Sequence, residues 1–532
     1  MNFSTLDWIV FIAYLCFMIA IGIYLSLSNK SKDSKEYFLA GRNLAWWAIG
    51  ASLIASNISA EQFIGMSGSG FKFGLAVASY EFMAAITLII VAWLFLPIYL
   101  KKGIYTLPQF IEQRFSKEVR TGLAIFWLLI FVFINVTSVL YLGALTLKAS
   151  LQVPLFLGVL CLALYSASFS IFGGLKTVVL TDIVQVVVLL LGGLLTSYLA
   201  LDAYGGGIGF FASLKALYLN SSDKFNMIIS KGETIYAMDN GELRDAWLDL
   251  PGISVLLGGM WIANLYYWGM NQYIIQRALA AKNLYEARKG IVFAAFIKII
   301  LPLIVVIPGI VAFSLNAPVA KGDEVYSWVL NNFIPAGLKG ICFAAVIAAV
   351  GSSISSMVNS VSTIFTMDIY KAYINKNSSD SEDVKVGKIT AFLALLLGAL
   401  IAPSLSSLDQ AFKFIQDFTG FFSPGILVIF LFGLFWKRAS NKAALSVLLF
   451  SLPLSFGLGL LFSEDQLPFM NRMGLSFLLL SLLMIFVSLK TNPGTDAKAV
   501  AYEDSWFSTS KEFKLASLAI CAILAAIYIT LA

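Results

Sequence analysis

ASLIASNISAEQFIGMSGSG, residues 51–70, lies where a membrane-spanning helix is expected. Eight polar side chains and three glycines interrupt its apolar residues. In hydrocarbon, irregular or polar backbone survives only where protein covers it or where it lines a water-filled cavity. The stretch therefore predicts a helix that is broken near the middle of the membrane, with its polar groups facing a binding site.

The composition around this stretch is that of a polytopic membrane protein. Of its 532 residues, 59% are hydrophobic and 12% are charged, whereas soluble domains carry about 25% charged residues. The chain has no histidine, which removes the commonest metal ligand. Its four cysteines lie in separate apolar runs, so neither a disulfide framework nor a zinc site is predicted. Because the net charge of +6 comes mainly from loops on one side of the membrane, it indicates no nucleic-acid partner.

The apolar runs predict an all-α protein with about 14 transmembrane helices of roughly twenty residues each. The first run is long enough to span and lacks a cleavage site, so it is expected to be a retained helix rather than a signal peptide. The predicted spans are 8–27, 45–71, 76–100, 120–147, 153–172, 178–202, 252–276, 288–316, 335–370, 386–408, 411–436, 442–463, 472–489 and 513–531.

The basic residues orient these spans. Of the 36 lysines and arginines, 25 follow odd-numbered spans, 10 follow even-numbered spans, and Lys298 lies inside a span. Cytoplasmic loops are enriched in basic residues. The odd loops are therefore predicted to be cytoplasmic and both termini to lie outside, in a cell membrane that we expect to be a bacterial inner membrane.

A second interrupted segment, GGMWIANLYYWGMNQ, occupies residues 258–272 of the seventh span. Five spans separate it from the first break, so the two breaks cross the membrane in opposite senses. This arrangement predicts two five-helix repeats of inverted topology, as in many secondary transporters. The predicted parts are an extra N-terminal helix and cytoplasmic loop at 1–44, a first repeat at 45–202, an outer loop at 203–251, a second repeat at 252–436 and extra C-terminal helices at 437–532.

Charges inside spans are rare and cost roughly 2.5–3.5 kcal/mol each on insertion scales, so they indicate function by default. Four are present: Glu61, Glu81, Asp182 and Lys298. Lys298 requires a partner, and Glu81 is the predicted one. The alternatives are a purely structural ion pair for these two residues and a water-exposed interfacial position for Asp182.

Serine hydroxyls in span 9 indicate a cation site. The segment AAVGSSISSM, residues 348–357, places Ser352, Ser353 and Ser356 on neighbouring turns. Hydroxyls combined with the freed carbonyls of a broken helix coordinate sodium in transporters of this kind. Packing of small residues between helices is the alternative explanation.

Neutral hydrogen-bonding groups and aromatic rings indicate a neutral polyol as the solute, because amides bond hydroxyls and a ring stacks on the C–H face of a sugar. Ordinary packing or an interfacial position is the alternative for each aromatic residue. The residues concerned are Asn57, Gln62, Asn264, Tyr267, Gln416, Tyr266 and Trp268.

Long, specific stretches between residues 57 and 426 resemble the solute:sodium symporter family, and its bacterial sodium/galactose branch in particular. They include NISAEQFIGMSGSG, ASYEFMAAITLII, TDIVQV, ANLYYWGMNQYIIQR, KGIVFAAFIK, SSISSMVNS and FIQDFTGFFSPGI. The resemblance implies a LeuT-type 5+5 inverted repeat with discontinuous helices. One departure concerns the solute: the galactose branch has a serine where this chain has Ala84.

The resemblance also implies roles for single residues. Tyr267 would stack on the sugar as the inner gate, and Asp182 would lie on the inward exit route of the ion. Sugar contacts would come from Asn57, Gln62, Glu81, Asn264, Lys298 and Gln416, and the outer gate from Met66, Tyr80 and Phe412. Sodium would bind the carbonyls of Ala55, Ile58 and Ala349 and the hydroxyls of Ser352 and Ser353.

The sequence thus predicts a secondary active transporter that couples sodium to a galactose- or glucose-like hexose by alternating access. It contains no nucleotide-binding G-x-x-x-x-G-K-[ST] loop, and no enzyme activity is predicted. Sodium is the expected co-transported ion, and a small neutral sugar and the lipid bilayer are the expected partners. The alternatives are a sodium symporter for an acidic sugar or myo-inositol and a membrane sensor built on the same fold; oligomeric state and stoichiometry stay open.

Overall fold

The computed structural model describes residues 3–28, 33–238, 241–407, 411–492 and 494–531, with the backbone alone for 407 and 411–417. The chain is helical apart from a two-stranded antiparallel hairpin, β1 (Ile235–Ala237) and β2 (Leu243–Asp245). The all-helical prediction is therefore confirmed, with this hairpin as the small exception.

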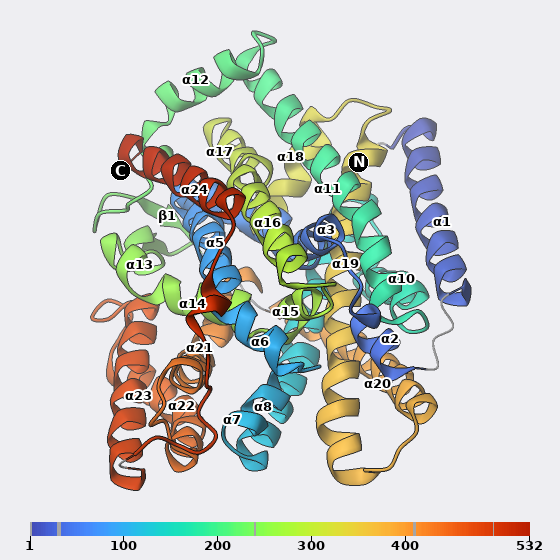
Figure 1. Cartoon of the computed structure of the whole chain (residues 1–532). Coiled ribbons are helices and arrows are strands. Elements are labelled where there is room, and N and C mark those ends of the chain that lie inside the picture. The colour runs from blue at the N-terminus through green and yellow to red at the C-terminus, as the bar shows by residue number, and fades with distance from the viewer. Residues whose placement is uncertain (1–2, 29–32, 239–240, 408–410, 493, 532) are drawn as a thin grey trace.

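Short turns join most of the helices (Figure 1). The longer connection between residues 220 and 253 contains the hairpin. The N-terminal half contains α1 (Thr5–Ser28), α2 (Ser34–Leu39), α3 (Trp46–Asn57), α4 (Ser67–Phe73), α5 (Ser79–Ile90), α6 (Leu96–Lys102), α7 (Leu107–Arg114), α8 (Lys117–Ile130), α9 (Thr137–Leu151), α10 (Leu155–Ser170), α11 (Gly174–Gly205) and α12 (Phe210–Asn220). The C-terminal half contains α13 (Ile253–Leu257), α14 (Gly259–Met270), α15 (Gln272–Leu279), α16 (Leu284–Val305), α17 (Ile307–Ser314), α18 (Val325–Phe333), α19 (Lys339–Ile364), α20 (Asp380–Ile401), α21 (Ala411–Phe435), α22 (Asn441–Leu461), α23 (Phe469–Thr491) and α24 (Lys511–Thr530).

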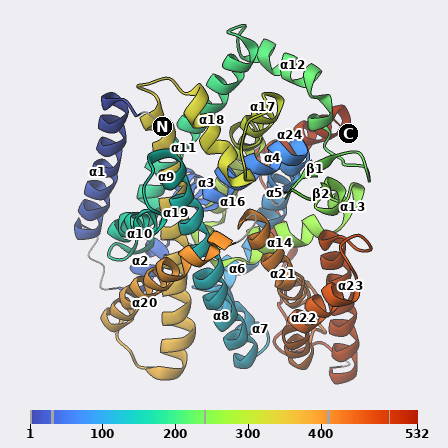
Figure 2. The same ribbon diagram turned by 180° about the vertical axis from the view of Figure 1, so that it is seen from behind.

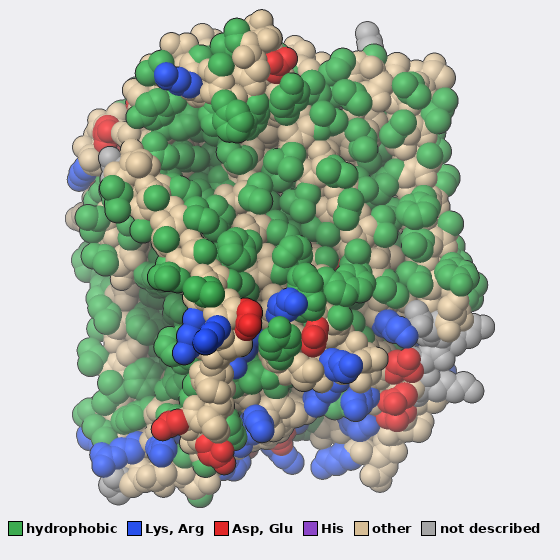
Figure 3. Space-filling model, turned by 45° about the horizontal axis from the view of Figure 1, so that its top comes forward, with side chains coloured by type: hydrophobic (Ala, Val, Ile, Leu, Met, Phe, Trp, Pro, Cys, Tyr) green, Lys and Arg blue, Asp and Glu red, His purple; other side chains and the backbone are tan. Residues whose placement is uncertain are grey.

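Each predicted apolar span falls on helical structure. Within the described ranges, 11 helices are long and apolar enough to cross a membrane, or up to 12 if a bent pair counts as one span. This number is smaller than the predicted 14 partly because two predicted spans contain only short helices. Helix α3 has 12 residues because it ends at a break, and α10 has 16. Figure 3 shows a broad hydrophobic surface, with most basic and acidic side chains gathered below it.

The first break lies where the opening stretch predicts it. Helix α3 ends at Asn57, and Ile58 is extended, with φ −74° and ψ 106°. The side chains beyond it bind the interrupted backbone: Gln62 Oε1 accepts the Ser59 N–H at 2.8 Å, and Ser59 Oγ accepts the Glu61 N–H at 3.0 Å. The chain then continues as a π-helical segment, Glu61–Met66, and as α4. Such π-helical turns are frequent at functional sites.

The second predicted segment, 258–272, is interrupted near its two ends. Residues 259–270 form the continuous helix α14, and the interruptions lie at its two ends. The helix pair meeting at Gly258 is bent by 75°, and Asn271 is extended, with φ −95° and ψ 122°. The interior Gly269 and Asn264 do not break the helix because each costs at most about 1 kcal/mol there. The prediction that segment 258–272 is interrupted is therefore confirmed, with the breaks at Gly258 and Asn271 rather than in the middle of the segment.

Helix α19 runs through the centre of the molecule. Together with the π-helical segment that follows it, it forms a span whose most apolar stretch is 94% buried. Helices α3, α10 and α11 pack against it, and α16 packs against α3 and α5. The rear view places α1 on one flank and α22 and α23 on the other (Figure 2). Both ends of the chain lie on the same side of the molecule as α12 (Figure 1).

Glycines allow the central helices to approach closely, as small residues do between membrane helices. A Cβ added to Gly50 of α3 would lie 2.7 Å from the Gly290 carbonyl oxygen of α16. A Cβ added to Gly309 of α17 would lie 2.0 Å from the Ser67 carbonyl oxygen of α4. The two halves of the first broken helix are thus each held against a helix of the second half of the chain.

Candidate functional site

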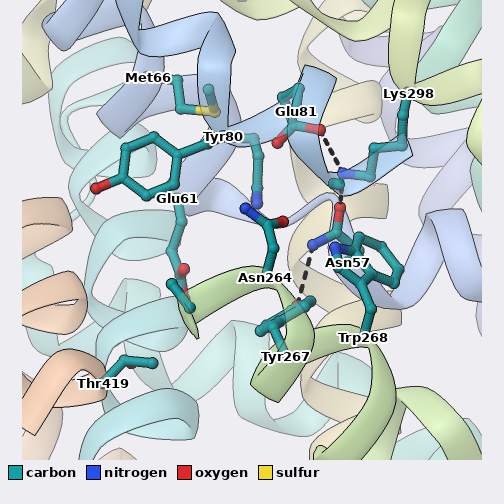
Figure 4. A pocket seen from close by; sticks show the side chains of 13 residues that line it. Asn57, Glu61, Met66, Tyr80, Glu81, Asn264, Tyr267, Trp268, Lys298 and Thr419 are labelled. Atoms are coloured by element: carbon teal, nitrogen blue, oxygen red, sulfur yellow. Dashed lines mark hydrogen bonds and ion pairs between the residues drawn. The ribbon is translucent and has the colours of Figure 1, made fainter. Parts of the chain in front are cut away.

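A cavity opens beside the first break, between the π-helical segment, α5, α14 and α16 (Figure 4). It encloses about 550 Å³ of empty space, part of it continuous with solvent. The lining is formed by Asn57, Glu61, Gln62, Met66, Tyr80, Glu81, Ala84, Ala263, Asn264, Tyr267, Trp268, Lys298 and Thr419.

An ion pair lies on one wall of this cavity. The Lys298 ammonium of α16 donates to the Glu81 carboxylate of α5 and to the side-chain oxygen of Asn57, Oδ1, at the end of α3. It also lies 5.0 Å from the centroid of the Trp268 ring. The lysine and the glutamate are both buried. The predicted pairing of Lys298 with Glu81 is confirmed, and it neutralises the charge of each group inside the membrane region.

Tyr267 closes the cavity on the side opposite Met66 (Figure 4). Its hydroxyl accepts a hydrogen bond from Asn57 Nδ2 at 3.0 Å and one from the Tyr273 hydroxyl at 2.7 Å. Asn57 therefore joins the ion pair to the tyrosine, because its oxygen binds Lys298 while its nitrogen binds Tyr267. If the Tyr267 ring moves, these two hydrogen bonds must break, or Asn57 and Tyr273 must move with it.

The amide and carboxylate groups of the cavity retain free hydrogen-bonding positions. Gln62 uses its oxygen on Ser59, and Asn264 uses its nitrogen on the Met260 carbonyl at 3.1 Å. Among the described residues, Gln62 Nε2 and Asn264 Oδ1 have no hydrogen-bond partner. Both a donor and an acceptor thus remain available to a neutral polar solute.

Most of the predicted solute contacts are brought together here. Asn57, Gln62, Glu81, Asn264, Tyr267 and Lys298 line the cavity, as do the predicted gate residues Met66 and Tyr80 and the substituted position Ala84. The predicted contact Gln416 and the predicted gate Phe412 lie in the part of α21 where side chains are not described. Trp268, Ala263 and Thr419 were not predicted as contacts. Only Trp268 gave a signal, as an aromatic residue beside Tyr267.

The predicted sodium ligands also lie together, where α3 ends against α19. Ser352 Oγ donates to the Ala55 carbonyl at 2.7 Å and lies 3.1 Å from the Ala349 carbonyl. Ser353 Oγ lies 3.3 Å from the Ile58 carbonyl. Three carbonyls and two hydroxyls thus meet at the break, which is a hard-oxygen set of the kind that coordinates sodium at discontinuous helices.

This oxygen set contains no carboxylate. Among the described residues, no group of three or more His, Cys, Asp or Glu residues could hold a metal ion. A monovalent ion needs less counter-charge than a divalent one. The donor set of neutral oxygens therefore fits a transported alkali cation better than a tightly held divalent metal.

A second polar network lies beside these oxygens, and the sequence did not predict it. Asp182 of α11 accepts a hydrogen bond from Ser52 Oγ at 2.5 Å and lies 3.9 Å from Arg277. Arg277 also donates to Ser356, and Ser356 is 2.7 Å from Ser56. All five side chains are buried.

This network corrects two expectations. Asp182 has no exposed side-chain surface, so the water-exposed interfacial alternative is wrong. Arg277, counted with the basic residues at the ends of the spans, is fully buried in α15. Span boundaries alone do not indicate such burial, because the partner Asp182 is distant in sequence. The network connects the predicted ion position to Asp182 through α19.

Comparison with known proteins agrees with this geometry. A sequence model of the sodium:solute symporter family matches residues 37–450. The sodium/glucose cotransporter of Vibrio parahaemolyticus is 48% identical over 99% of this chain and 98% of its own length. The sodium/myo-inositol cotransporter 2 of the rabbit, Oryctolagus cuniculus, is 34% identical over 85% of this chain and 69% of its own length.

Two solved structures share the fold. A sodium-coupled sialic acid symporter in a substrate-bound outward-open state has a TM-score of 0.78 at 21% identity, covering 92% of this chain and 98% of that chain. MHP1, a nucleobase-cation-symport-1 family transporter, has a TM-score of 0.54 at 15% identity, covering 86% and 96%. At these identities the likeness concerns the fold alone.

Proposed function

The chain belongs to the sodium:solute symporter family and is a sodium-coupled solute symporter, and from this premise we propose that its solute is a neutral hexose of the glucose or galactose type. The proposal is supported by the Vibrio relative, whose name states a sodium/glucose cotransporter. It is also supported by the cavity, whose free amide groups and aromatic side chains match the hydroxyls and the C–H face of a sugar ring.

The observation that carries the proposed coupling is that the break after Asn57 contributes groups both to the solute cavity and to the proposed sodium site. Asn57 and Gln62 face the cavity, while the carbonyls of Ala55 and Ile58 face the hydroxyls of α19. Occupation of either site orders the same two turns of backbone. Two ligands that each stabilise one arrangement bind cooperatively, so the shared break supplies a physical reason for the coupling of sodium and solute.

In the proposed cycle, sodium binds at Ala55, Ile58, Ala349, Ser352 and Ser353 and stabilises the outward-open arrangement. The sugar then binds to the amides, to the Lys298–Glu81 pair and to Gln416, and Met66, Tyr80 and Phe412 close above it. Tyr267 stacks on the ring and opens inward when its bonds to Asn57 and Tyr273 break. Sodium leaves along the route that contains Asp182.

An acidic sugar is a weaker candidate. Among the described residues of the lining, Lys298 is the one cation, and Glu81 and Asn57 already bind it. A carboxylate would have to displace Glu81 from a buried pair, and breaking such a pair costs about 3–5 kcal/mol. myo-Inositol is favoured over an acidic sugar by the rabbit relative's name and by the lining, in which Glu61 and Glu81 outnumber the one cation, Lys298.

Uptake into proteoliposomes tests the proposal. Labelled glucose, galactose, myo-inositol and a sialic acid are compared in sodium medium and in potassium medium. We expect sodium-dependent uptake of a hexose that exceeds uptake of myo-inositol and of the acidic sugar. Equal hexose uptake in sodium-free potassium medium would contradict the coupling, and preferential uptake of the acidic sugar would contradict the solute assignment.

The membrane orientation belongs to the same proposal. Both termini lie outside a bacterial inner membrane, residues 45–202 and 252–436 form the two inverted repeats, and 203–251 form the outer loop. The basic residues support this orientation, because 25 of 36 follow odd-numbered spans. The extra helices at 1–44 and 437–532 flank the two repeats.

A further inference from the structure

A second cavity lies on the outer surface of the bundle, between the start of α16 and the start of α24. It encloses about 980 Å³ of empty space and is separate from the solute cavity in every lining residue. Its walls combine apolar side chains with charges of both signs. The residues that matter here are Tyr285, Arg288, Lys289, Val292, Glu512 and Phe513.

Arg288 builds this groove rather than offering a free charge to it. Its guanidinium donates to the carbonyls of Ala92 at 3.1 Å, Ser508 at 2.6 Å and Trp506 at 3.0 Å. These bonds hold the segment before α24 against α16 and tie α16 to the π-helical segment Val91–Phe95 that follows α5. These bonds fix the shape of the groove. They do so although α24 itself packs loosely, since only 11% of its most apolar stretch is buried.

The two remaining charges of the groove, Lys289 and Glu512, attract each other across it, and Ser510 also contacts the Glu512 carboxylate. The Lys289 ammonium lies 4.4 Å from the Trp46 ring centroid and 5.9 Å from that of Tyr285. Within the described chain, neither Lys289 nor Glu512 has an ion-pair partner within 4 Å. Both side chains are exposed at the groove. The site thus presents one positive and one negative group beside an apolar wall.

We propose that this groove binds a phosphatidylethanolamine molecule of the bilayer. Its phosphate contacts Lys289, its primary ammonium group contacts Glu512, and an acyl chain lies along Val292 and Phe513. A zwitterionic headgroup matches one cation and one anion, whereas an anionic lipid leaves Glu512 without a partner. Phosphatidylcholine also carries both charges, but its quaternary ammonium has no N–H to donate to the carboxylate.

The position of the groove fits a lipid headgroup. Tyr285, Trp46 and Trp506 surround it, and tryptophan and tyrosine are enriched at membrane interfaces. Figure 3 shows most basic side chains gathered in the lower half of one face, below the broad hydrophobic surface. Basic pockets between membrane helices are known lipid headgroup sites. In the proposed orientation, this interface belongs to the cytoplasmic leaflet.

Native mass spectrometry of the purified full-length chain tests the site. The delipidated protein is titrated with phosphatidylethanolamine, phosphatidylcholine or phosphatidylglycerol with identical acyl chains. We expect the first phosphatidylethanolamine to bind roughly fivefold more tightly than phosphatidylcholine, the ratio that one additional N–H hydrogen bond to the carboxylate supports. Glu512→Gln abolishes this preference, and Lys289→Gln weakens the binding of both lipids.

Matched controls separate this site from general surface charge. Glu503→Gln and Lys514→Gln change exposed charges near the groove that do not line it, so the preference persists in both. Circular dichroism and a monodisperse elution profile show that each variant is folded. Equal binding of phosphatidylethanolamine and phosphatidylcholine to the unaltered chain overturns the proposal, as does tighter binding of phosphatidylglycerol that increases in Glu512→Gln.

Discussion

Asn57 shows how much a single residue can connect in this protein. Its oxygen accepts from Lys298, and its nitrogen donates to Tyr267 at 3.0 Å. Lys298 in turn binds Glu81 from a third helix. Four residues from α3, α5, α14 and α16 therefore form one buried hydrogen-bonded group, in which the loss of any member leaves a polar atom without a partner.

The first prediction concerns the buried ion pair. Lys298→Met leaves the Glu81 carboxylate uncompensated, and Glu81→Gln leaves Lys298 with a neutral partner; one-sided removal costs about 3–5 kcal/mol. We expect both variants to lose hexose uptake and to unfold at lower temperature in detergent. The double variant recovers most of the stability without uptake, because neither charge is then left alone. Unchanged unfolding temperatures in the single variants would contradict this account.

The second prediction concerns the hydroxyls of α19. Ser352→Ala removes the oxygen that reaches the Ala55 carbonyl at 2.7 Å. We expect uptake by this variant to need a higher sodium concentration for half-maximal rate, roughly tenfold for the loss of about 1.4 kcal/mol of ion binding. Ser355→Ala is the matched control, because its buried hydroxyl donates only to the Ser352 carbonyl within α19. Equal sodium dependence in both variants argues against the proposed ion position.

At the scale of the element, the end of helix α3 determines which backbone groups are free to bind a ligand. The end of α3 at Asn57 frees backbone groups that Ser59 and Gln62 then bind. The extended Ile58 directs its carbonyl to Ser353 on α19. A continuous helix would use these carbonyls internally, since each residue accepts from the residue four positions on. The interruption therefore leaves free the oxygens that we propose as ion ligands.

Helix α19 is held at its own start by the first helix of the chain. The Asp7 carboxylate of α1 accepts the N–H groups of Gly337 and Gly340, each at 3.0 Å, and also binds Ser4. First-turn N–H groups have no partner inside their own helix. The N-terminal helix α1 thus supplies the acceptor that the start of α19 lacks.

The third prediction follows from this contact. Asp7→Ala leaves buried N–H groups unsatisfied and is expected to destabilise the protein by about 1 kcal/mol, as the loss of a helix cap does. Asp7→Asn retains an acceptor oxygen and should lose less. Thermal unfolding in detergent measures both, and Asp465→Asn, an exposed aspartate near the start of α23, is the control. An unfolding temperature unchanged by Asp7→Ala would contradict the capping role.

At the scale of the whole molecule, the two termini lie on the same side as α12 (Figure 1). Basic residues gather mainly at the loops of the other side. The apolar belt between these two sides fixes the position of the protein in the bilayer, because exposed hydrophobic side chains are stable only in lipid. From the positive-inside rule we expect the side that carries most basic residues to face the cytoplasm.

The fourth prediction tests this orientation. In a variant whose four cysteines are replaced, single cysteines at Asn220 and Ser463 should react with a membrane-impermeant thiol reagent added outside intact cells. Cysteines at Asn377 and Lys101 should react only after permeabilisation. All four positions are exposed in the fold, so burial does not explain a difference. Labelling of Asn377 in intact cells would falsify the proposed topology.

The sequence by itself determined the membrane class, the broken span at 51–70 and the pairing of Lys298 with Glu81. Each followed from one physical constraint: polar groups and charges cannot face hydrocarbon alone. The same constraint brought Asn57, Gln62 and the serines of α19 into the predicted site. Such conclusions need only the composition of a segment and the dimensions of the bilayer.

Only the tertiary structure decided where in segment 258–272 the breaks fall, the burial of Arg277 against Asp182, the β1–β2 hairpin and the groove beside α24. Each depends on which helix faces which. Residues such as Asp182 and Arg277 are distant in sequence, and the spacing of a span does not give its rotation toward a neighbour. Packing between helices fixes that rotation, so these features emerge only when the whole bundle is assembled.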